Sequence, residues 1–437
     1  MKTIDNIPTG KIGRTSKMLQ TGFKIGGNYL KYYGKKALNS ELSREELDQS
    51  NAEDIYDGLK SLKGSALKVA QMLSMEKSLL PAAYVEKFSL AQFSVPPLSA
   101  PLVKKTFKKY HGKYPEEIFD SFSSESVNAA SIGQVHKAEL NGKKLAVKIQ
   151  YPGVAESISS DLALVKPIAL KMFNLQGEDS EKYFREVEDK LMEETDYTME
   201  LQQSKEISES CDHLPNLLFP KYYEDLSSEK IITMDWMTGI HLSEFAKSNP
   251  SAEEADKIGQ TLWDFYFYQI HALKAVHADP HPGNFLVDEQ KRLIAIDFGC
   301  IKRLPEDFYN PYFELTKKEN FEDMDFLQTK LRELEILHES DSPKETEYFT
   351  RMYYQMLSLF AKPLNSVHFD FSDPSFLQSI SALSEEYSRD KELRKMNTNR
   401  GSEHFLYISR TFMGLYSLLH ELGARVEVNN WEKFLTK

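Results

Sequence analysis

"HADPHPGNFLV" (277–287) and, four residues later, "RLIAIDFG" (292–299) are the two segments from which the fold can be inferred. Asp279 and Asn284 lie five residues apart, and Asp297 opens Asp-Phe-Gly directly after the apolar run Leu293–Ile296. Phosphoryl transfer needs a carboxylate that orients or deprotonates the attacking hydroxyl, together with oxygen ligands that hold magnesium. Asp-Phe-Gly alone is weak evidence, but its combination with Asp-x4-Asn predicts Asp279 as catalytic and Asn284 and Asp297 as Mg²⁺ ligands.

The histidines of this region offer a competing interpretation, a zinc site. His277 and His281 have the four-residue spacing of zinc ligands on a helix, and His271 lies nearby. Pro280 and Pro282 forbid a regular helix across that interval. We therefore expect His277 and His281 to stabilise the loop by hydrogen bonds rather than to bind a metal ion.

A hairpin with a lysine on its second strand lies upstream. Two β-rich runs, 131–140 and 143–150, flank Asn141-Gly142, which is a strong hairpin signal. In "LAVKIQ" (145–150), Lys148 falls on the face opposite the three aliphatic side chains. This lysine fits the kinase strand that binds the α- and β-phosphates. Ala146, on the same face, is small enough for an adenine ring to lie against it.

The phosphate-binding lysine needs a carboxylate partner, and "EETDYTME" (193–200) supplies several candidates. They are Glu193, Glu194, Asp196 and Glu200. Glu194 falls on an apolar helical row, which favours a partly buried position over a solvated acidic face. Clustered carboxylates repel one another, so cations or a metal ion are expected close by.

Composition and charge limit the function classes. The 437 residues carry a net charge of −12, which argues against nucleic acid as a partner. The two cysteines fit a reducing compartment, no apolar run reaches the roughly 20 residues of a membrane span, and no signal peptide is evident.

Residues 1–37 hold eight basic residues against one acidic residue, with apolar residues near helical spacing. This segment either lies on an anionic membrane surface or packs as a solvated helix.

The order of these elements indicates an α+β, bilobal, protein-kinase-like fold. A small β-rich unit with one long helix precedes a larger helical unit. The glycine-rich loop of conventional kinases is absent, and the corresponding place reads "VNAASIGQVH" (127–136), with Gly133 as its one glycine. Further upstream, "ALKVAQMLS" (66–74) puts Lys68 and Gln71 on one face of an otherwise apolar helix.

These motifs together resemble the UbiB-like (aarF-domain, ABC1-type) atypical kinase family. Its K-x-G-Q motif corresponds to "KVAQ" (68–71), its alanine-rich loop to "NAASIGQVH" (128–136) and its E-x-D motif to "ETD" (194–196). Its catalytic loop and Asp-Phe-Gly correspond to "DPHPGN" (279–284) and "DFG" (297–299), and the resemblance covers roughly residues 45–427. Ala70 replaces the glycine of K-x-G-Q, and Asn128 replaces the first alanine of the loop, which leaves nucleotide preference open.

The resemblance implies a helical extension packed over the active site, covering the groove where a protein substrate would dock. Lys68 and Gln71 would then reach Glu194 and Asp196, and Glu200 would pair with Lys148. ATP or ADP, with Mg²⁺, is the implied cofactor. The residues expected to contact the nucleotide are Ala129, Ala130, Ser131, Gly133, Gln134, Ala146, Lys148, Asp235 and Met237. The expected segments are a basic amphipathic segment (1–37), the helical extension (38–115), the N-lobe (116–237) and the C-lobe (238–437).

Three functional hypotheses follow. The first is an ATP- and magnesium-dependent atypical kinase or ATPase that supports isoprenoid-lipid or quinone metabolism, located in the cytoplasm or peripherally on the inner face of a membrane. The second is a small-molecule phosphotransferase of the aminoglycoside/choline kinase type, in which Lys68 and Gln71 have no role. The third is a non-catalytic scaffold whose partner or lipid binding depends on nucleotide. The intact Asp279, Asn284, Asp297 and Lys148 favour catalysis.

Overall fold

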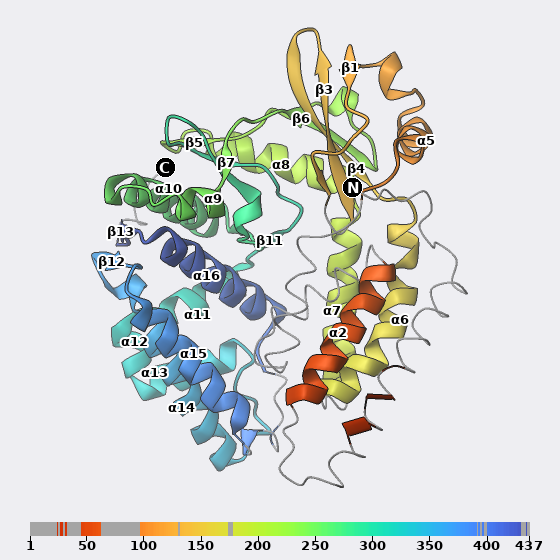
Figure 1. Ribbon diagram of the computed structural model, residues 1–437. Coiled ribbons are helices and arrows are strands. Elements are labelled where there is room, and N and C mark those ends of the chain that lie inside the picture. Colours follow the sequence, from red (N-terminus) through yellow and green to blue (C-terminus); the bar gives the residue numbers. More distant parts are fainter. Residues whose placement is uncertain are drawn as a thin grey trace. The chain divides into compact units, whose positions relative to one another are not determined.

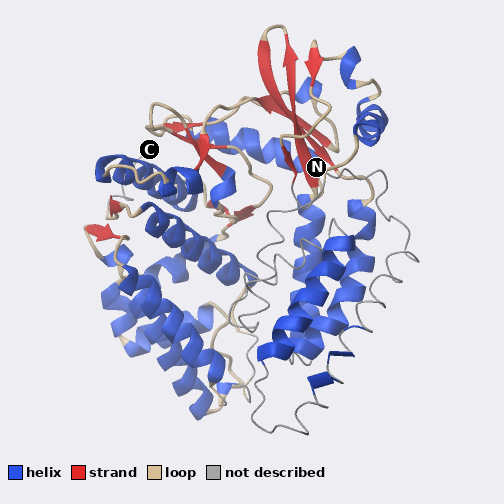
Figure 2. Cartoon of the chain, viewed as in Figure 1, coloured by secondary structure: helices blue, strands red, loops and turns tan. Residues whose placement is uncertain are grey.

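The computed structural model describes residues 24, 27–28, 31–32, 45–62, 97–129, 132–173, 178–390, 392–393, 396, 400–429 and 434. Figure 1 shows these residues as a ribbon and Figure 2 shows their helices and strands. The chain divides into two compact units. Unit 1 comprises Met1–Gln202 and Lys221–Trp236, and unit 2 comprises Gln203–Pro220 and Met237–Lys437. The predicted sites at Lys68, Ala70, Gln71, Ala130 and Ser131 lie outside the described residues.

Unit 1 is built on an antiparallel sheet in the order β1-β3-β4-β6, with β2 paired to β3. The strands are β1 (Ser121–Phe122), β2 (Asn128–Ala129), β3 (Gly133–Leu140), β4 (Lys143–Gln150) and β6 (Ile231–Asp235). Asn141 and Gly142 have φ angles of 51° and 75°, as the left-handed positions of a tight hairpin turn require. The predicted hairpin is therefore confirmed, with Leu140 paired to Lys143.

The helices of unit 1 share a core with one face of this sheet. They are α2 (Glu45–Leu62), α5 (Ala100–His111), α6 (Val154–Phe173) and α7 (Glu178–Glu194). The first part of α8 (Tyr197–Cys211) packs with Ile232 of β6 in a separate cluster. Leu145, Val147 and Ile149 of β4 are buried in the same cluster as Ile55 of α2 and Ile158 of α6. The face of β4 that carries Lys148 is therefore turned away from this core, as the alternation of the sequence predicted.

The described residues of unit 2 form three small sheets among helices. The first has the order β5-β10-β9-β7, the second pairs β8 with β11, and the third pairs β12 with β13. The strands are β5 (Leu217–Leu218), β7 (Ile240–His241), β8 (Ala275–His277), β9 (Phe285–Val287), β10 (Leu293–Ala295), β11 (Ile301–Arg303), β12 (His368–Asp370) and β13 (Arg425–Glu427). Because β8 to β11 flank the Asp279 and Asp297 segments, these pairings determine where both segments lie.

Long helices with aromatic faces form the core of unit 2. The helices are α9 (Leu242–Lys247), α10 (Ala252–His271), α11 (Glu306–Leu315), α12 (Lys318–Glu322), α13 (Met324–Glu333), α14 (Pro343–Phe360), α15 (Pro374–Arg389) and α16 (Glu403–Leu422). Trp263 and Phe267 of α10 stack at 4.1 Å between ring centroids, and Phe412 of α16 lies 6.0 Å from Phe267. Such aromatic packing buries a large apolar area. None of the described helices combines the length and apolar character that a membrane crossing requires.

One segment falls in a different unit from the predicted domain. Gln203–Pro220 belongs to unit 2, whereas the sequence placed it in the N-lobe. Ile207 and Cys211 of α8 are buried in the core of unit 2, and Leu217 of β5 pairs in parallel with Leu293 of β10. These contacts span long sequence separations, which periodicity does not reveal.

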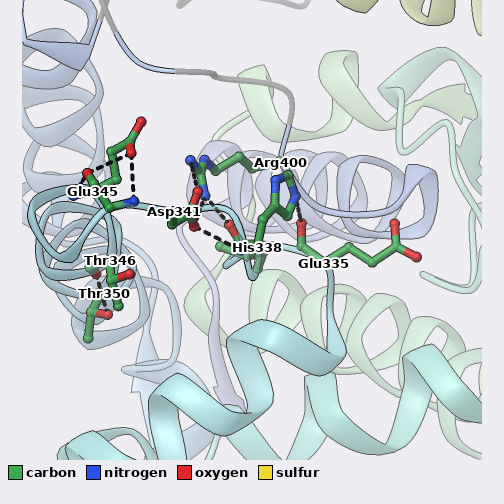
Figure 3. Close-up of polar contacts among 9 residues, drawn as sticks. Glu335, His338, Asp341, Glu345, Thr346, Thr350 and Arg400 are labelled. Atoms are coloured by element: carbon green, nitrogen blue, oxygen red, sulfur yellow. Dashed lines mark hydrogen bonds and ion pairs between the residues drawn. The ribbon is translucent and has the colours of Figure 1, made fainter.

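A buried ion pair joins the residues before α16 to the connection between α13 and α14. Arg400 makes a bidentate contact with Asp341, at 2.6 Å and 2.8 Å, and both side chains are almost fully buried. Arg400 also donates to the carbonyl of Ile336 and lies 3.7 Å from the ring centroid of Phe349. Figure 3 shows this cluster, with His338 donating its backbone N–H to Asp341. The N-terminal end of α16 is therefore attached firmly to the body of unit 2.

Replacing Asp341 with asparagine should destabilise unit 2, because a buried guanidinium would lose its anionic partner. The expected loss is about 3 kcal/mol in unfolding free energy, measured by urea unfolding at pH 7. Glu392→Gln is the control, because the Lys344–Glu392 pair is exposed and such pairs contribute little. Equal effects of the two substitutions would contradict the expectation.

The same pair predicts a pH dependence. Arg400 holds the pKa of Asp341 below its ordinary value of 3.8. The stabilisation is therefore complete above that value and is lost as the pH falls through the lowered pKa. The difference between wild type and D341N should shrink over that acidic range.

Candidate active site

The phosphate-binding lysine expected on β4 forms an ion pair with helix α8. Lys148 Nζ lies 2.5 Å from Glu200 Oε1, and the two side chains are 16% and 7% exposed. Glu200 is the partner that the family resemblance implied. A pair this close and this protected from water holds the lysine in one place. The pair joins the sheet and α8 within unit 1.

Tyr197, the first residue of α8, supports this pair and was not singled out in the sequence. Its ring is fully buried, and Lys148 Nζ lies 5.1 Å from the ring centroid. A Cβ atom on Gly133 would lie only 2.6 Å from the Tyr197 hydroxyl and 2.8 Å from the carbonyl oxygen of Ile149. Gly133 is therefore required by the space between two neighbours, and its proximity to Tyr197 is invisible in a linear sequence.

The acidic turn between α7 and α8 is held by polar side chains on both sides. Gln150, on the same face of β4 as Lys148, donates to the carbonyl of Thr195, and Lys230 donates to the same oxygen. Asp196 is exposed and accepts the backbone N–H groups of Thr198 and Met199, so it caps α8. Glu194 is buried, as its position on the apolar row predicted.

Gln134 has a side chain that faces the core instead of the loop that precedes β3. Its oxygen accepts the backbone N–H of Leu98 at 2.7 Å, and its nitrogen lies 2.8 Å from His136 Nε2. His136 in turn contacts the carbonyl of Ser123, and burial lowers its pKa. The backbone of Gln134 lies between β2 and β4, paired with Ala129 and Ile149, and the nucleotide contact of this residue stays a prediction. Ala129 pairs with Gln134 and is half-buried.

Three other residues were expected to contact the nucleotide. Ala146 is buried on β4 and shares the face of Lys148. Asp235 accepts the Tyr223 hydroxyl at 2.7 Å and the backbone N–H of Lys221 at 3.2 Å, so its carboxylate is engaged within unit 1. Met237 is half-buried and begins the second segment of unit 2.

In unit 2, strand pairing brings the Asp279 and Asp297 segments together. The N–H of Ala278, directly before Asp279, donates to the carbonyl of Cys300, directly after Asp-Phe-Gly. The N–H of Ile296, directly before Asp297, donates to the carbonyl of Asn284. These two backbone bonds link the flanks of all three predicted residues, so Asp279, Asn284 and Asp297 belong to one locality.

The loop itself is ordered by short-range hydrogen bonds. Asn284 Nδ2 donates to the carbonyl of Asp279 at 3.0 Å, and His281 Nδ1 accepts the N–H of Gly283 at 3.0 Å. Since the amide nitrogen of Asn284 is turned toward the loop, its oxygen points the other way. Asp297 Oδ1 accepts the N–H of Gly299. The Asp297 carboxylate and the Asn284 amide oxygen are hard oxygen donors, the ligand type that Mg²⁺ prefers, so the residues expected to hold the ion fit it.

The remaining histidines have structural positions. His271 is buried in unit 2, its Nδ1 lies 2.6 Å from the Tyr309 hydroxyl, and burial lowers its pKa to about 3. His277 is buried in β8, and its backbone N–H donates to Gln269. Within the described ranges, no cluster of three or more His, Cys, Asp or Glu side chains is suited to a metal ion.

Tyr266 on α10 is a second residue that the sequence did not indicate. It is fully buried, and burial together with the nearby charge of Asp279 raises its pKa well above the usual value. Its ring lies 6.4 Å from that of Phe285, at the start of β9. No short-range motif marks it, because α10 precedes the loop by a full strand.

Comparisons with known proteins agree with this arrangement. The chain is 28% identical over 331 residues to "Probable serine/threonine-protein kinase abkA" of Dictyostelium discoideum, covering 70% of this chain and 58% of that protein. It is 27% identical over 389 residues to "Atypical kinase COQ8B, mitochondrial" of Danio rerio, covering 86% and 61%. The aligned parts thus span less than two thirds of these relatives' own lengths.

A solved structure and a family profile complete the comparison. The structure of Rv3197 from Mycobacterium tuberculosis, in complex with erythromycin, superposes with a TM-score of 0.60 at 25% identity, covering 90% of this chain and 97% of that one. The fold is therefore kinase-like, as the sequence predicted. The profile of the ABC1 atypical kinase-like domain matches residues 90–330, more than half of the chain. This chain belongs to the ABC1 (UbiB-like) atypical kinase family.

Proposed function

We propose that this protein binds ATP with Mg²⁺ and acts as an atypical kinase or ATPase in isoprenoid-lipid or quinone metabolism at a membrane surface. The observation that carries the proposal is the strand pairing that brings Asp279, Asn284 and Asp297 into one locality of unit 2. The ion pair between Lys148 and Glu200 supports it from unit 1. The quinone link rests on relatives such as the COQ8B kinase.

Each residue has a distinct task in this proposal. Lys148, held by Glu200, binds phosphate oxygens of the nucleotide. Asp279 orients the attacking hydroxyl or water and takes its proton as the new oxygen–phosphorus bond forms and the bond to the β-phosphate oxygen breaks. Asn284 and Asp297 would hold Mg²⁺, which when bound neutralises charge on the phosphate oxygens. ADP is the leaving group.

Helix α5 supports contact with an anionic surface. Lys104, Lys105, Lys108 and Lys109 lie on the face opposite the buried Val103 and Phe107. These lysines and Tyr114 line a hollow of about 750 Å³. Glu116 also lines it and forms an ion pair with Lys104. Lys108 Nζ lies 4.0 Å from the Tyr114 ring centroid. Basic side chains beside an exposed aromatic residue are typical of contacts with anionic lipid headgroups. Most of the basic segment 1–37 lies outside the described residues.

Asp297→Asn should reduce phosphate release from ATP at least about 100-fold, because a charged magnesium ligand becomes neutral. The same substitution should abolish the effect of Mg²⁺ on binding of a fluorescent ADP analogue. Asp288→Asn is the matched control, since Asp288 caps the turn before β10 and pairs with Arg292 away from the site. Unchanged activity in D297N would remove the metal assignment.

Glu200→Gln should weaken nucleotide binding about tenfold, because the phosphate-binding lysine would lose the carboxylate that positions it. The measurement is titration with the fluorescent ADP analogue, together with circular dichroism as a check of folding. Glu206→Gln, on the same helix, removes only an exposed ion pair with Arg303 and should bind like wild type. Equal affinity in E200Q and E206Q would exclude the proposed role of the pair.

Reversing the charge of the α5 face should weaken binding to vesicles. The triple variant Lys105→Glu/Lys108→Glu/Lys109→Glu is expected to lose at least about tenfold in affinity for phosphatidylglycerol vesicles at about 0.1 M salt, with little change for neutral vesicles. The control makes the same change in net charge at Lys317, Lys318 and Lys362, which are exposed in unit 2. Similar losses in the two triple variants would argue against docking through α5.

A further inference from the structure

Helix α16 contacts the catalytic loop and the residue after Asp-Phe-Gly at once. Tyr407 packs with Ala278 and Cys300 in a small buried cluster, in which all three side chains are 5% exposed or less. Ala278 directly precedes Asp279, and Cys300 directly follows Asp-Phe-Gly. A side chain of α16 is therefore buried in one cluster with residues of both segments that the hydrogen bond from Ala278 to Cys300 joins.

Two turns further along α16, Gly414 packs so closely against the catalytic loop that a side chain would not fit between them. A Cβ atom at this position would lie 2.1 Å from Cγ, 3.0 Å from Cβ and 3.2 Å from the carbonyl oxygen of Pro280. Pro280 is buried and directly follows Asp279. Distances this short mean that any larger residue would force Pro280, or the helix, to move.

Helical propensity does not explain a glycine here. Gly414 lies in the middle of a 20-residue helix, where glycine costs about 1 kcal/mol relative to alanine. It lies seven positions after Tyr407, which puts both on one face of the helix. The close approach of Pro280 accounts for the glycine, and the shared face accounts for the contacts with both segments.

Both ends of α16 are attached to the rest of unit 2. Before its first turn, Arg400 binds Asp341, and the N–H of Gly401 donates to the carbonyl of Glu335. After its last turn, β13 pairs with β12, and Gln260 of α10 exchanges two hydrogen bonds with the backbone of Glu427. A helix that is fixed at both ends can rigidly support a loop that packs against its middle.

We propose that Gly414 and Tyr407 of α16 are positioning residues, which set where Asp279 lies relative to Asp297. The effect on catalysis rests on the proposed function. The structural part of the proposal does not: the middle of α16 holds the segments 278–284 and 297–300 in place. Neither residue needs to touch substrate or metal for this role.

The test compares Gly414→Ala with Gly259→Ala in the full chain. A Cβ on Gly259, in α10, would lie 2.4 Å from Cβ of Ala424, so it overpacks the same unit away from the catalytic loop. We expect both variants to lower the thermal midpoint. Hydrogen exchange in the nucleotide-free chain should become faster in peptides covering 278–284 and 297–301 for G414A but stay as in wild type for G259A.

A magnesium titration adds a functional measurement. In G414A, the Mg²⁺ concentration for half-maximal binding of the fluorescent ADP analogue should rise about tenfold, and kcat should fall more than KM changes. G259A should match wild type in both. A wild-type chain without Mg²⁺-dependent binding would overturn the proposed function, while the exchange comparison would still decide the role of α16.

A compensating substitution guards against a G414A variant that does not fold. Pro280→Ala removes the Cγ atom that lies nearest to the added methyl group, so the Pro280→Ala/Gly414→Ala double variant should recover slow exchange in 278–284 relative to G414A. Unchanged exchange in G414A, or equal exchange and magnesium response in G414A and G259A, would overturn the proposal.

Discussion

Two backbone hydrogen bonds, from Ala278 to Cys300 and from Ile296 to Asn284, are the constraint on which the candidate site of unit 2 depends. They extend the β8–β11 and β9–β10 pairings, so the positions of the catalytic side chains are set by backbone pairing. No contact between the catalytic side chains themselves is needed to bring them together. The chemistry can therefore use residues that contribute little to folding. Asn284 serves both purposes, since its amide nitrogen orders the loop by a hydrogen bond to the Asp279 carbonyl and its amide oxygen is turned away from the loop.

In unit 1 the equivalent constraint is electrostatic. Lys148 and Glu200 are removed from water together, and such pairs contribute less to stability than their geometry suggests, because desolvation offsets most of the attraction. What the pair provides is a fixed position for an ammonium group. Tyr197 and Gln150 surround it with a buried ring and a hydrogen bond to the adjacent turn, which restricts the alternatives open to the lysine.

Much of the fold was accessible from short-range sequence patterns. The Asn141-Gly142 turn, the inward face of β4 and the order of motifs all depend on residues within a few positions of one another. The features that were not foreseen depend on distant neighbours. The nucleotide contact of Gln134 stays a prediction, but the hydrogen bonds of its side chain with Leu98 and His136 were not foreseen. Ile207 and Cys211 were expected in the N-lobe, but their packing partners lie in unit 2. Only the fold brings such pairs together.

The close packing of Gly133 against Tyr197 limits which substitutions the chain can accept at position 133. The residue at the start of β3 is restricted by a hydroxyl on α8, more than sixty positions later in the chain. Replacing Tyr197 with phenylalanine would remove that hydroxyl and keep the ring beside Lys148, but a Cβ atom at 133 would still lie 2.8 Å from the carbonyl oxygen of Ile149. Position 133 is therefore restricted twice, by a side chain distant in the sequence and by the backbone of the neighbouring strand, and a change at 197 alone does not free it.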